Sequence, residues 1–153
     1  MNQSAPITDS ITTLWRSIPA LSTLVPGGLR YGTLKPAARP YAQLNVSLEG
    51  KPTFHSGKSY IQRYVVDILV WSNAQVGNAG TIQATMETLL GRDTKLVLAG
   101  NATTLTCLLD PAGIEEEAER SAKGGIGQNI FIAGARWIIT LVEDKRLASA
   151  GTL

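Results

Sequence analysis

Two segments of this chain are apolar on both faces of the strands that they predict. From Tyr60 to Trp71 the side chains alternate with a period of two, and each resulting face carries large apolar residues. The same holds from Gln128 to Glu143. An antiparallel sheet with one face in water should instead alternate cleanly between apolar and polar residues. The sequence therefore predicts a sheet whose second face is covered, either by loops of the same chain or by another subunit.

Two helices are expected beside these strands. Apolar residues follow helical spacing from Ile7 to Ile18, with Thr8 as the N-cap, and Pro19 should end this helix because it cannot continue the hydrogen-bond ladder. Ser72 and Gln75 have the spacing of a capping box ahead of a second apolar helical face. That face runs over residues 76–90, and Gly91 is the expected stop.

The remaining apolar patterns predict strands and turns. The chain of 153 residues is expected to form one domain over residues 1–153, with flexible ends at about 1–6 and 144–153. The fold class is α+β: a mainly antiparallel sheet of four to five strands packed with two helices on one face. The expected strands are 29–32, 41–49, 60–71, 95–98, 103–109 and 128–143, and the expected long loops are 50–58 and 111–127.

Composition excludes several classes of function. The 14 basic and 12 acidic residues give a net charge of +2, which argues against a nucleic-acid-binding tail. One cysteine and one histidine leave no disulfide framework and no usual zinc cluster. We find no signal peptide and no apolar stretch long enough to span a membrane, so a soluble protein made inside a cell is expected. No cofactor and no metal are expected.

The motifs that suggest chemistry are weak. Gly57-Lys58-Ser59 ends like a phosphate-binding loop, but Pro52 stands at the required glycine and a strand follows instead of a helix. The glycines at 124–127 also precede a strand, which is the wrong context for a dinucleotide. The glutamates at 115–117 lack the spacing of a calcium loop. We interpret the two glycine-containing segments as loops and the glutamates as a solvated helix turn or loop.

His55 and Cys107 are the remaining candidates for catalysis. His55 is the residue able to act as a base near neutral pH, and a Ser–His–Asp arrangement is an open alternative, although no G-x-S-x-G motif supports it. Cys107 alternates with two leucines in an expected strand, so it is interpreted as a small buried apolar residue.

The order of these elements resembles that of the phage tail terminator and tail completion family, of the minor tail protein U type. The resemblance covers roughly residues 7–143 and rests on order and apolar pattern, not on a chemical signature. Its parts are the opening helix around Leu14-Trp15, the segment 24–29, a strand opened by Pro40-Tyr41, the strand 60–72, the helix from Ala79 to Leu90 and a closing strand through 137–139.

The resemblance implies a structural function without catalysis. Members of this family form rings, typically hexameric, on the end of the finished tail tube. The ring stops polymerisation of the tube and offers a docking surface to the head connector, and DNA later passes through its lumen. The implied partners are further copies of the chain, the tail-tube protein and the head connector or neck protein. The implied location is the head-proximal end of the virion tail, after assembly in the host cytoplasm.

We name a candidate assembly interface on the strands and on the 50–58 loop, where ordering on contact with a partner is expected. Two alternatives stay open: another head–tail connector or neck protein, and, from a different class, a small-ligand-binding or enzymatic α+β domain that uses His55. The interface candidates are Arg63, Trp137, Phe131, Ile139, Lys51, His55 and Lys58.

Overall fold

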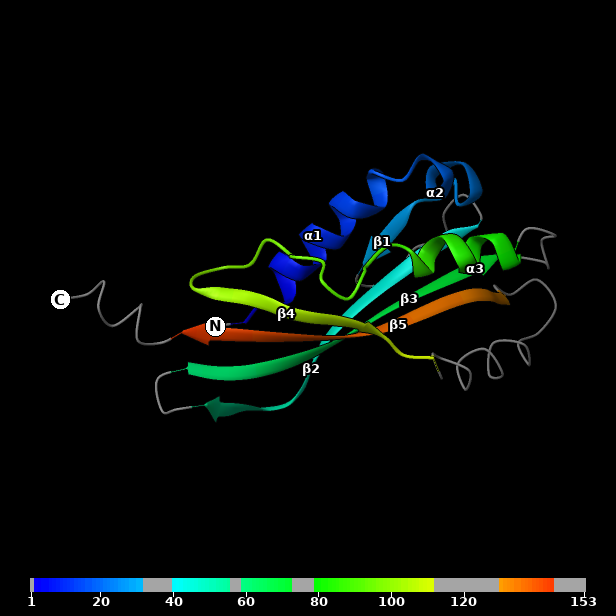
Figure 1. The fold of residues 1–153 in the computed structure, drawn as a ribbon. Helices are drawn as coiled ribbons and strands as arrows, with labels where there is room; N and C mark the ends of the chain where they lie inside the picture. The colour runs from blue at the N-terminus through cyan, green and yellow to red at the C-terminus, as the bar shows by residue number, and fades with distance from the viewer. Residues whose placement is uncertain (1, 32–39, 56–58, 73–78, 112–129, 145–153) are drawn as a thin grey trace.

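The structure of the chain is a computed structural model, which describes residues 2–31, 40–55, 59–72, 79–111 and 130–144. Within these residues the chain forms a five-stranded, mostly antiparallel sheet with three helices packed against it (Figure 1). The expected α+β class is confirmed. For residues 51–55, 59, 130–132 and 144 the structure describes the backbone but not the side chains.

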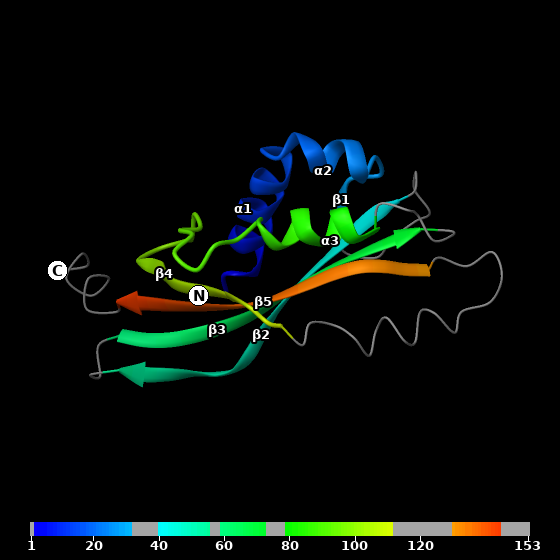
Figure 2. The same cartoon turned by 45° about the vertical axis from the view of Figure 1, so that its right-hand side comes forward.

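The sheet has the strand order β1-β2-β3-β5-β4. Strand β1 runs parallel to β2, and all other neighbours are antiparallel (Figure 2). The long strands β2, β3 and β5 therefore form the centre of the sheet, and the shorter β1 and β4 lie at its two edges. The bounds are β1 Leu29–Tyr31, β2 Tyr41–His55, β3 Ser59–Ser72, β4 Ala102–Leu109 and β5 Ile130–Asp144.

The first helix, α1 (Ser4–Arg16), starts one turn earlier than the sequence predicts. Its N-cap position is Gln3, and Thr8 lies inside the helix, where its hydroxyl donates to the Ser4 carbonyl oxygen at 2.7 Å. Pro6 is tolerated because the first turn needs no N–H donor there. Within the segment 1–6, for which a flexible start is expected, Gln3 is fully buried and residues 4–6 belong to α1.

Pro19 follows the end of α1 and begins a second helix, α2 (Pro19–Leu24), which is not among the two helices expected from the sequence. Proline suits the first helical position because its missing N–H is not needed there. The third helix, α3 (Ala79–Glu87), ends before the predicted stop at Gly91. Of the predicted capping box, Ser72 is the last residue of β3, and Gln75 lies outside the described residues.

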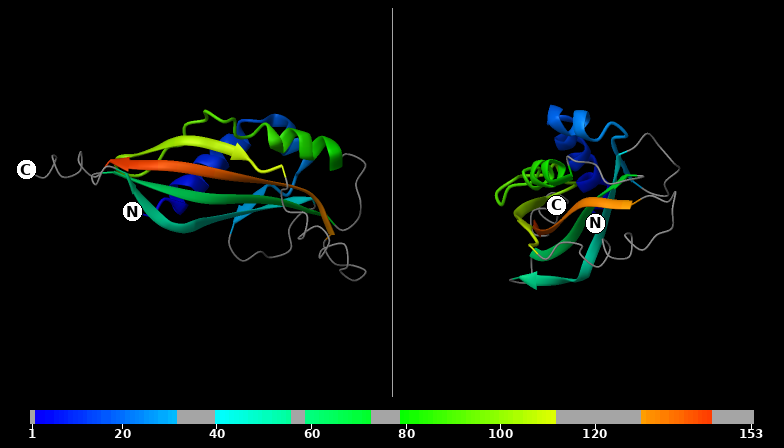
Figure 3. Two further views of the ribbon diagram at one scale, coloured as in Figure 1. Left: turned by 60° about the horizontal axis from the view of Figure 1, so that its bottom comes forward. Right: turned by 90° about the vertical axis from the view of Figure 1, so that its right-hand side faces the viewer.

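All three helices lie on the same face of the sheet (Figure 3). Apolar residues of α1 and α3 pack there against alternate residues of the strands, which become fully buried. Burial of such apolar surface contributes about 25 cal/mol per Å² to folding. Large fully buried members of this core include Ile7 and Ile11 of α1, Met86 of α3, Tyr64 and Ile68 of β3, and Trp137, Ile139 and Leu141 of β5.

Two predicted segments have a different structure. Strand β2 continues through the predicted 50–58 loop as far as His55, with an irregularity in the register between Glu49 and Thr53. Gly50 has φ +68°, which a glycine adopts at little cost, so the strand can bend there without ending. The predicted strand 95–98 is irregular in the structure. Most of the predicted 111–127 loop lies outside the described residues.

Long-range hydrogen bonds hold the irregular segment at residues 95–99. The Gln3 side chain donates to the Ala99 carbonyl oxygen at 3.1 Å and accepts from the Ala99 N–H at 2.9 Å. The Gln3 N–H also donates to the Tyr64 hydroxyl at 2.9 Å, which joins the start of α1 to the sheet. Gln3 thus joins Ala99 to the start of α1, and the Leu96 N–H donates to the Thr104 hydroxyl of β4 at 3.2 Å.

Candidate assembly surface

The sheet face opposite the helices, which we call the open face, carries a row of apolar side chains. In the register, Val65 of β3 lies opposite Ile138 of β5, which lies opposite Leu108 of β4. Val65 and Ile138 are half-buried, and Leu108 is 46% exposed. Ile61 and Val142 form a second half-buried pair on the same face. Among the described residues, no helix covers this row (Figures 2 and 3).

The charges on the open face lie on either side of the apolar row. Arg136 donates to both carboxylate oxygens of Asp67, with distances of 2.6 Å from Nε to Oδ1 and 2.8 Å from Nη2 to Oδ2. The register places the two residues directly opposite each other. Arg63 is exposed, and it lies opposite Thr140 on one neighbouring strand and Glu49 on the other. The open face thus combines an apolar row with charges that can orient a partner.

Trp137 and Ile139, two of the predicted interface residues, belong to the core of the single copy. Both have no exposed surface, because they point to the helix side of β5 and pack beneath the helices. A side chain buried in this way cannot contact another copy unless the fold opens. Their assignment to the interface is therefore corrected. The Trp137 indole N–H has no hydrogen-bond partner among the described residues.

For the other predicted interface residues, the structure describes the side chain only of Arg63. Arg63 lies on the open face, as described above. Phe131 pairs with Trp71 after a one-residue register shift, so it does not continue the alternation that contains Trp137. His55 is the last residue of β2 and pairs with Ser59. The side chains of Phe131, His55 and Lys51, and all of Lys58, lie outside the described part of the structure.

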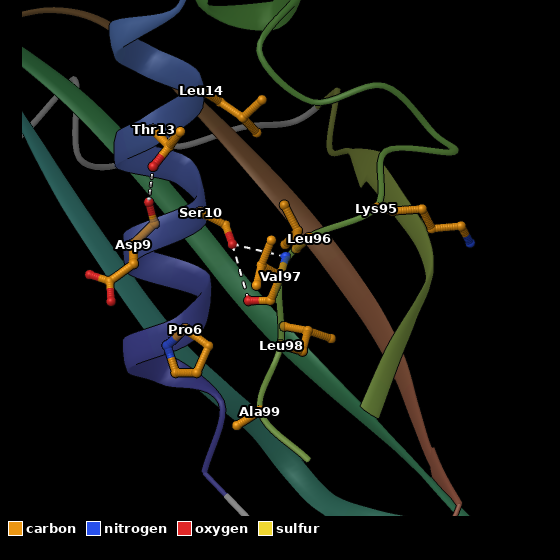
Figure 4. A pocket seen from close by; sticks show the side chains of 10 residues that line it. All are labelled: Pro6, Asp9, Ser10, Thr13, Leu14, Lys95, Leu96, Val97, Leu98 and Ala99. Carbon is orange, nitrogen blue, oxygen red and sulfur yellow. Dashed lines mark hydrogen bonds between the residues drawn. The ribbon is translucent and has the colours of Figure 1, made fainter. Parts of the chain in front are cut away.

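A hollow formed by described residues lies elsewhere, between α1 and residues 95–99 (Figure 4). Its volume is about 530 Å³. Ser10 is used there for structure, since its hydroxyl donates to the Val97 carbonyl oxygen at 3.2 Å and accepts from the Val97 N–H at 3.0 Å. Asp9 and Lys95 extend away from Ser10 in opposite directions (Figure 4). The hollow therefore brings no acid–base pair together.

Cys107 is buried, as its position in an apolar strand predicts. Burial raises the pKa of its thiol from 9.0 to about 11, and Lys95 offsets part of this shift. The thiol donates weakly to the Thr94 carbonyl oxygen at 3.6 Å. A neutral, enclosed thiol is a poor nucleophile.

The described residues form neither a metal-binding cluster nor a membrane-spanning helix. No group of three histidine, cysteine, aspartate or glutamate residues is gathered where it could hold a metal ion. None of the described helices has the length and hydropathy that a membrane span requires.

No protein-family model, curated protein or solved structure matches this chain. A functional interpretation therefore depends on the geometry of the open face and on the order of the elements.

The sequence analysis did not single out Leu108 or Ile138 as interface residues. Leu108 follows Cys107 in a strand with two other leucines, and the sequence does not say which of them a helix covers. The strand predicted from Gln128 has apolar residues on both faces, which indicates that one face lies outside the core. Only the pairing of β5 with β3 and β4 shows which residues lie on that face.

Proposed function

We propose that this chain is a structural phage protein that forms a ring on the end of the tail tube, stops tube polymerisation and joins the tail to the head. The observation that carries this proposal is the apolar row of Val65, Ile138 and Leu108 on a sheet face without a described helix. Such a row favours contact with another protein surface. The function of the ring itself comes from the resemblance in element order that the sequence analysis describes.

The mass of the protein in solution tests the proposal. Light scattering would be measured on the chain alone and after mixing with the tail-tube protein encoded in the same genome, and negative-stain images would be recorded of both samples. We expect a closed ring of several copies in at least one of them. A strict monomer in both samples would contradict the proposed function.

A matched pair of variants ties the result to the open face. Leu108→Glu places a charge within the apolar row and should reduce ring formation. Val97→Glu makes the same kind of change at a side chain that is also exposed but lies beside α1, so it should leave ring formation unchanged. Binding to the head connector without binding to the tube would favour the neck-protein alternative.

A further inference from the structure

Residues 94–99 have the composition of a segment that can pair with a second chain as a β-strand. The sequence Thr-Lys-Leu-Val-Leu-Ala contains one charged residue and neither proline nor glycine. Short apolar segments of this kind form intermolecular β-structure when they are exposed. Val97, near the centre of the segment, is 80% exposed. The single copy therefore needs a means of keeping this segment from strand pairing.

The backbone of residues 95–99 is bonded by side chains and not by a strand. Among the described residues, no backbone–backbone hydrogen bond outside the helices and strands involves this segment. On the side of β4, the Leu96 N–H donates to the Thr104 hydroxyl at 3.2 Å. The Lys95 ammonium donates to the Thr104 carbonyl oxygen at 2.6 Å. The alternation of a strand is thus present in the sequence, while the strand ladder itself is replaced by polar side chains.

Two side chains at α1 bond to the segment on its other side. The Ser10 hydroxyl donates to the Val97 carbonyl oxygen at 3.2 Å and accepts from the Val97 N–H at 3.0 Å (Figure 4). The amide of Gln3 makes the same two kinds of bond with Ala99, at 3.1 and 2.9 Å. Val97 and Ala99 are alternate residues, as are the residues through which a strand bonds to one neighbour. The two side chains therefore occupy the backbone groups that a pairing strand would use.

We infer that Ser10 and Gln3 cap residues 95–99 against strand addition by a second chain. Each of the two side chains engages both the donor and the acceptor of one backbone residue, so an approaching chain finds neither group available. Proteins commonly protect a strand edge by covering it with a helix or a loop. Here polar side chains of a helix give this protection to a segment outside the sheet. The inference concerns the single copy and does not depend on the proposed ring.

Ser10→Ala tests the cap, because it removes the hydroxyl while alanine remains favourable in a helix. Exchange of the Val97 amide proton should become about ten-fold faster, the size expected when a hydrogen bond is lost. On incubation the variant should form aggregates that bind thioflavin T, and the wild type should form none under the same conditions. Thioflavin T binds stacked β-strands, so this signal is distinct from the assembly of a closed ring.

Two single variants serve as controls on the same helix. Thr13 is also exposed beside residues 95–99, but its hydroxyl donates to the Asp9 carbonyl oxygen within α1 at 3.0 Å. Thr13→Ala should therefore leave exchange at Val97 unchanged. Ile11→Val weakens the buried face of α1 without removing a bond to the segment. Neither control should form aggregates that bind thioflavin T.

A double variant locates the association. Ser10→Ala combined with Val97→Lys places a second charge in the exposed segment and should abolish the thioflavin T signal, since charges oppose strand pairing. Ser10→Ala combined with Thr23→Lys, at an exposed site of α2, should keep the signal. Aggregates of the Val97→Lys double variant would show that another segment pairs, and would overturn the inference. Unchanged exchange at Val97 in Ser10→Ala, or no aggregation of that variant, would overturn it as well.

Discussion

At the scale of single residues, Trp137 is a fully buried side chain of the core, so its main effect should be on the stability of the single copy. Trp137→Ala should lower the free energy of unfolding by about 3–5 kcal/mol, because it leaves a large cavity under the helices. Chemical denaturation of the variant measures this loss. Val97→Ala, at an exposed site, should change stability by no more than about 0.5 kcal/mol. Equal effects in the two variants would contradict the placement of Trp137 in the core.

Cys107 predicts a dependence of stability on alkaline pH. The raised pKa means that above pH 9 the unfolded chain loses the thiol proton while the folded chain keeps it up to about pH 11. The unfolded state then binds fewer protons, so stability falls as the pH rises, by up to about 1.4 kcal/mol per pH unit. Denaturation curves of the wild type and of Cys107→Ala measure the effect. The wild type should lose more stability than the variant over this range, and parallel curves would contradict it.

Residue-level predictions from sequence succeed where a local pattern decides the outcome. The spacing of Ile7, Ile11 and Trp15 correctly places these residues on the buried face of α1. The burial of Cys107 follows in the same way from strand alternation. Trp137 and Arg63 could not be separated in this manner, because each lies on a strand with two apolar faces and only the position of the helices distinguishes core from surface.

At the scale of elements, α3 is joined to the sheet by the buried side chains of Ile82 and Met86 and by the hydrogen bonds of Gln83. Strand β4 pairs with β5 only as far as Trp137, so the edge of β5 is free of β4 at Gly134. The Gln83 side chain bonds to this backbone in both directions, donating to the Gly134 carbonyl oxygen at 2.5 Å and accepting from its N–H at 2.7 Å. The side-chain amide of Gln83 thus supplies the donor and the acceptor that a neighbouring strand would otherwise offer to Gly134.

Gln83→Ala should destabilise the protein by about 1–3 kcal/mol, because it leaves buried backbone groups of Gly134 without their partners. The loss would be measured by chemical denaturation, with amide exchange at Gly134 as a local readout. Thr81→Ala, an exposed position on the same helix, is the control. Slow exchange at Gly134 in the Gln83 variant would show that another group protects this edge.

The elements that the sequence did not predict depend on contacts distant in the sequence, or on residues that are compatible with more than one local structure. Pro19 is a valid helix stop and an equally valid helix start, and the chain uses both properties. Gly50 and Pro52 are typical loop residues, yet a register irregularity lets β2 pass through them. Residues 95–98 have the alternation of a strand, but the Val97 backbone bonds to the Ser10 side chain, which is far away in the sequence, and the Leu96 N–H donates to the Thr104 hydroxyl.

At the scale of the whole molecule, Arg63 distinguishes effects on assembly from effects on folding. Arg63→Glu brings two glutamates opposite each other, because Glu49 is its neighbour on β2, and should cost about 0.2–1 kcal/mol of stability. The double variant Arg63→Glu with Glu49→Arg should recover that stability. Denaturation curves measure this part of the prediction.

The double variant should nevertheless assemble less well than the wild type, because it reverses both charges at the rim of the apolar row. Light scattering under ring-forming conditions measures assembly. Wild-type assembly by the double variant would show that Arg63 acts only on the fold of the single copy.

The irregular stretch of β2 around Gly50 has a consequence for how many copies can associate. Endless stacking of chains, as in a fibril, needs a straight backbone edge whose donors and acceptors repeat without interruption. Here the regular ladder breaks after Glu49, and Pro52 has no N–H to offer. A second chain added to this edge would therefore meet an interrupted series of donors and acceptors, which opposes endless stacking.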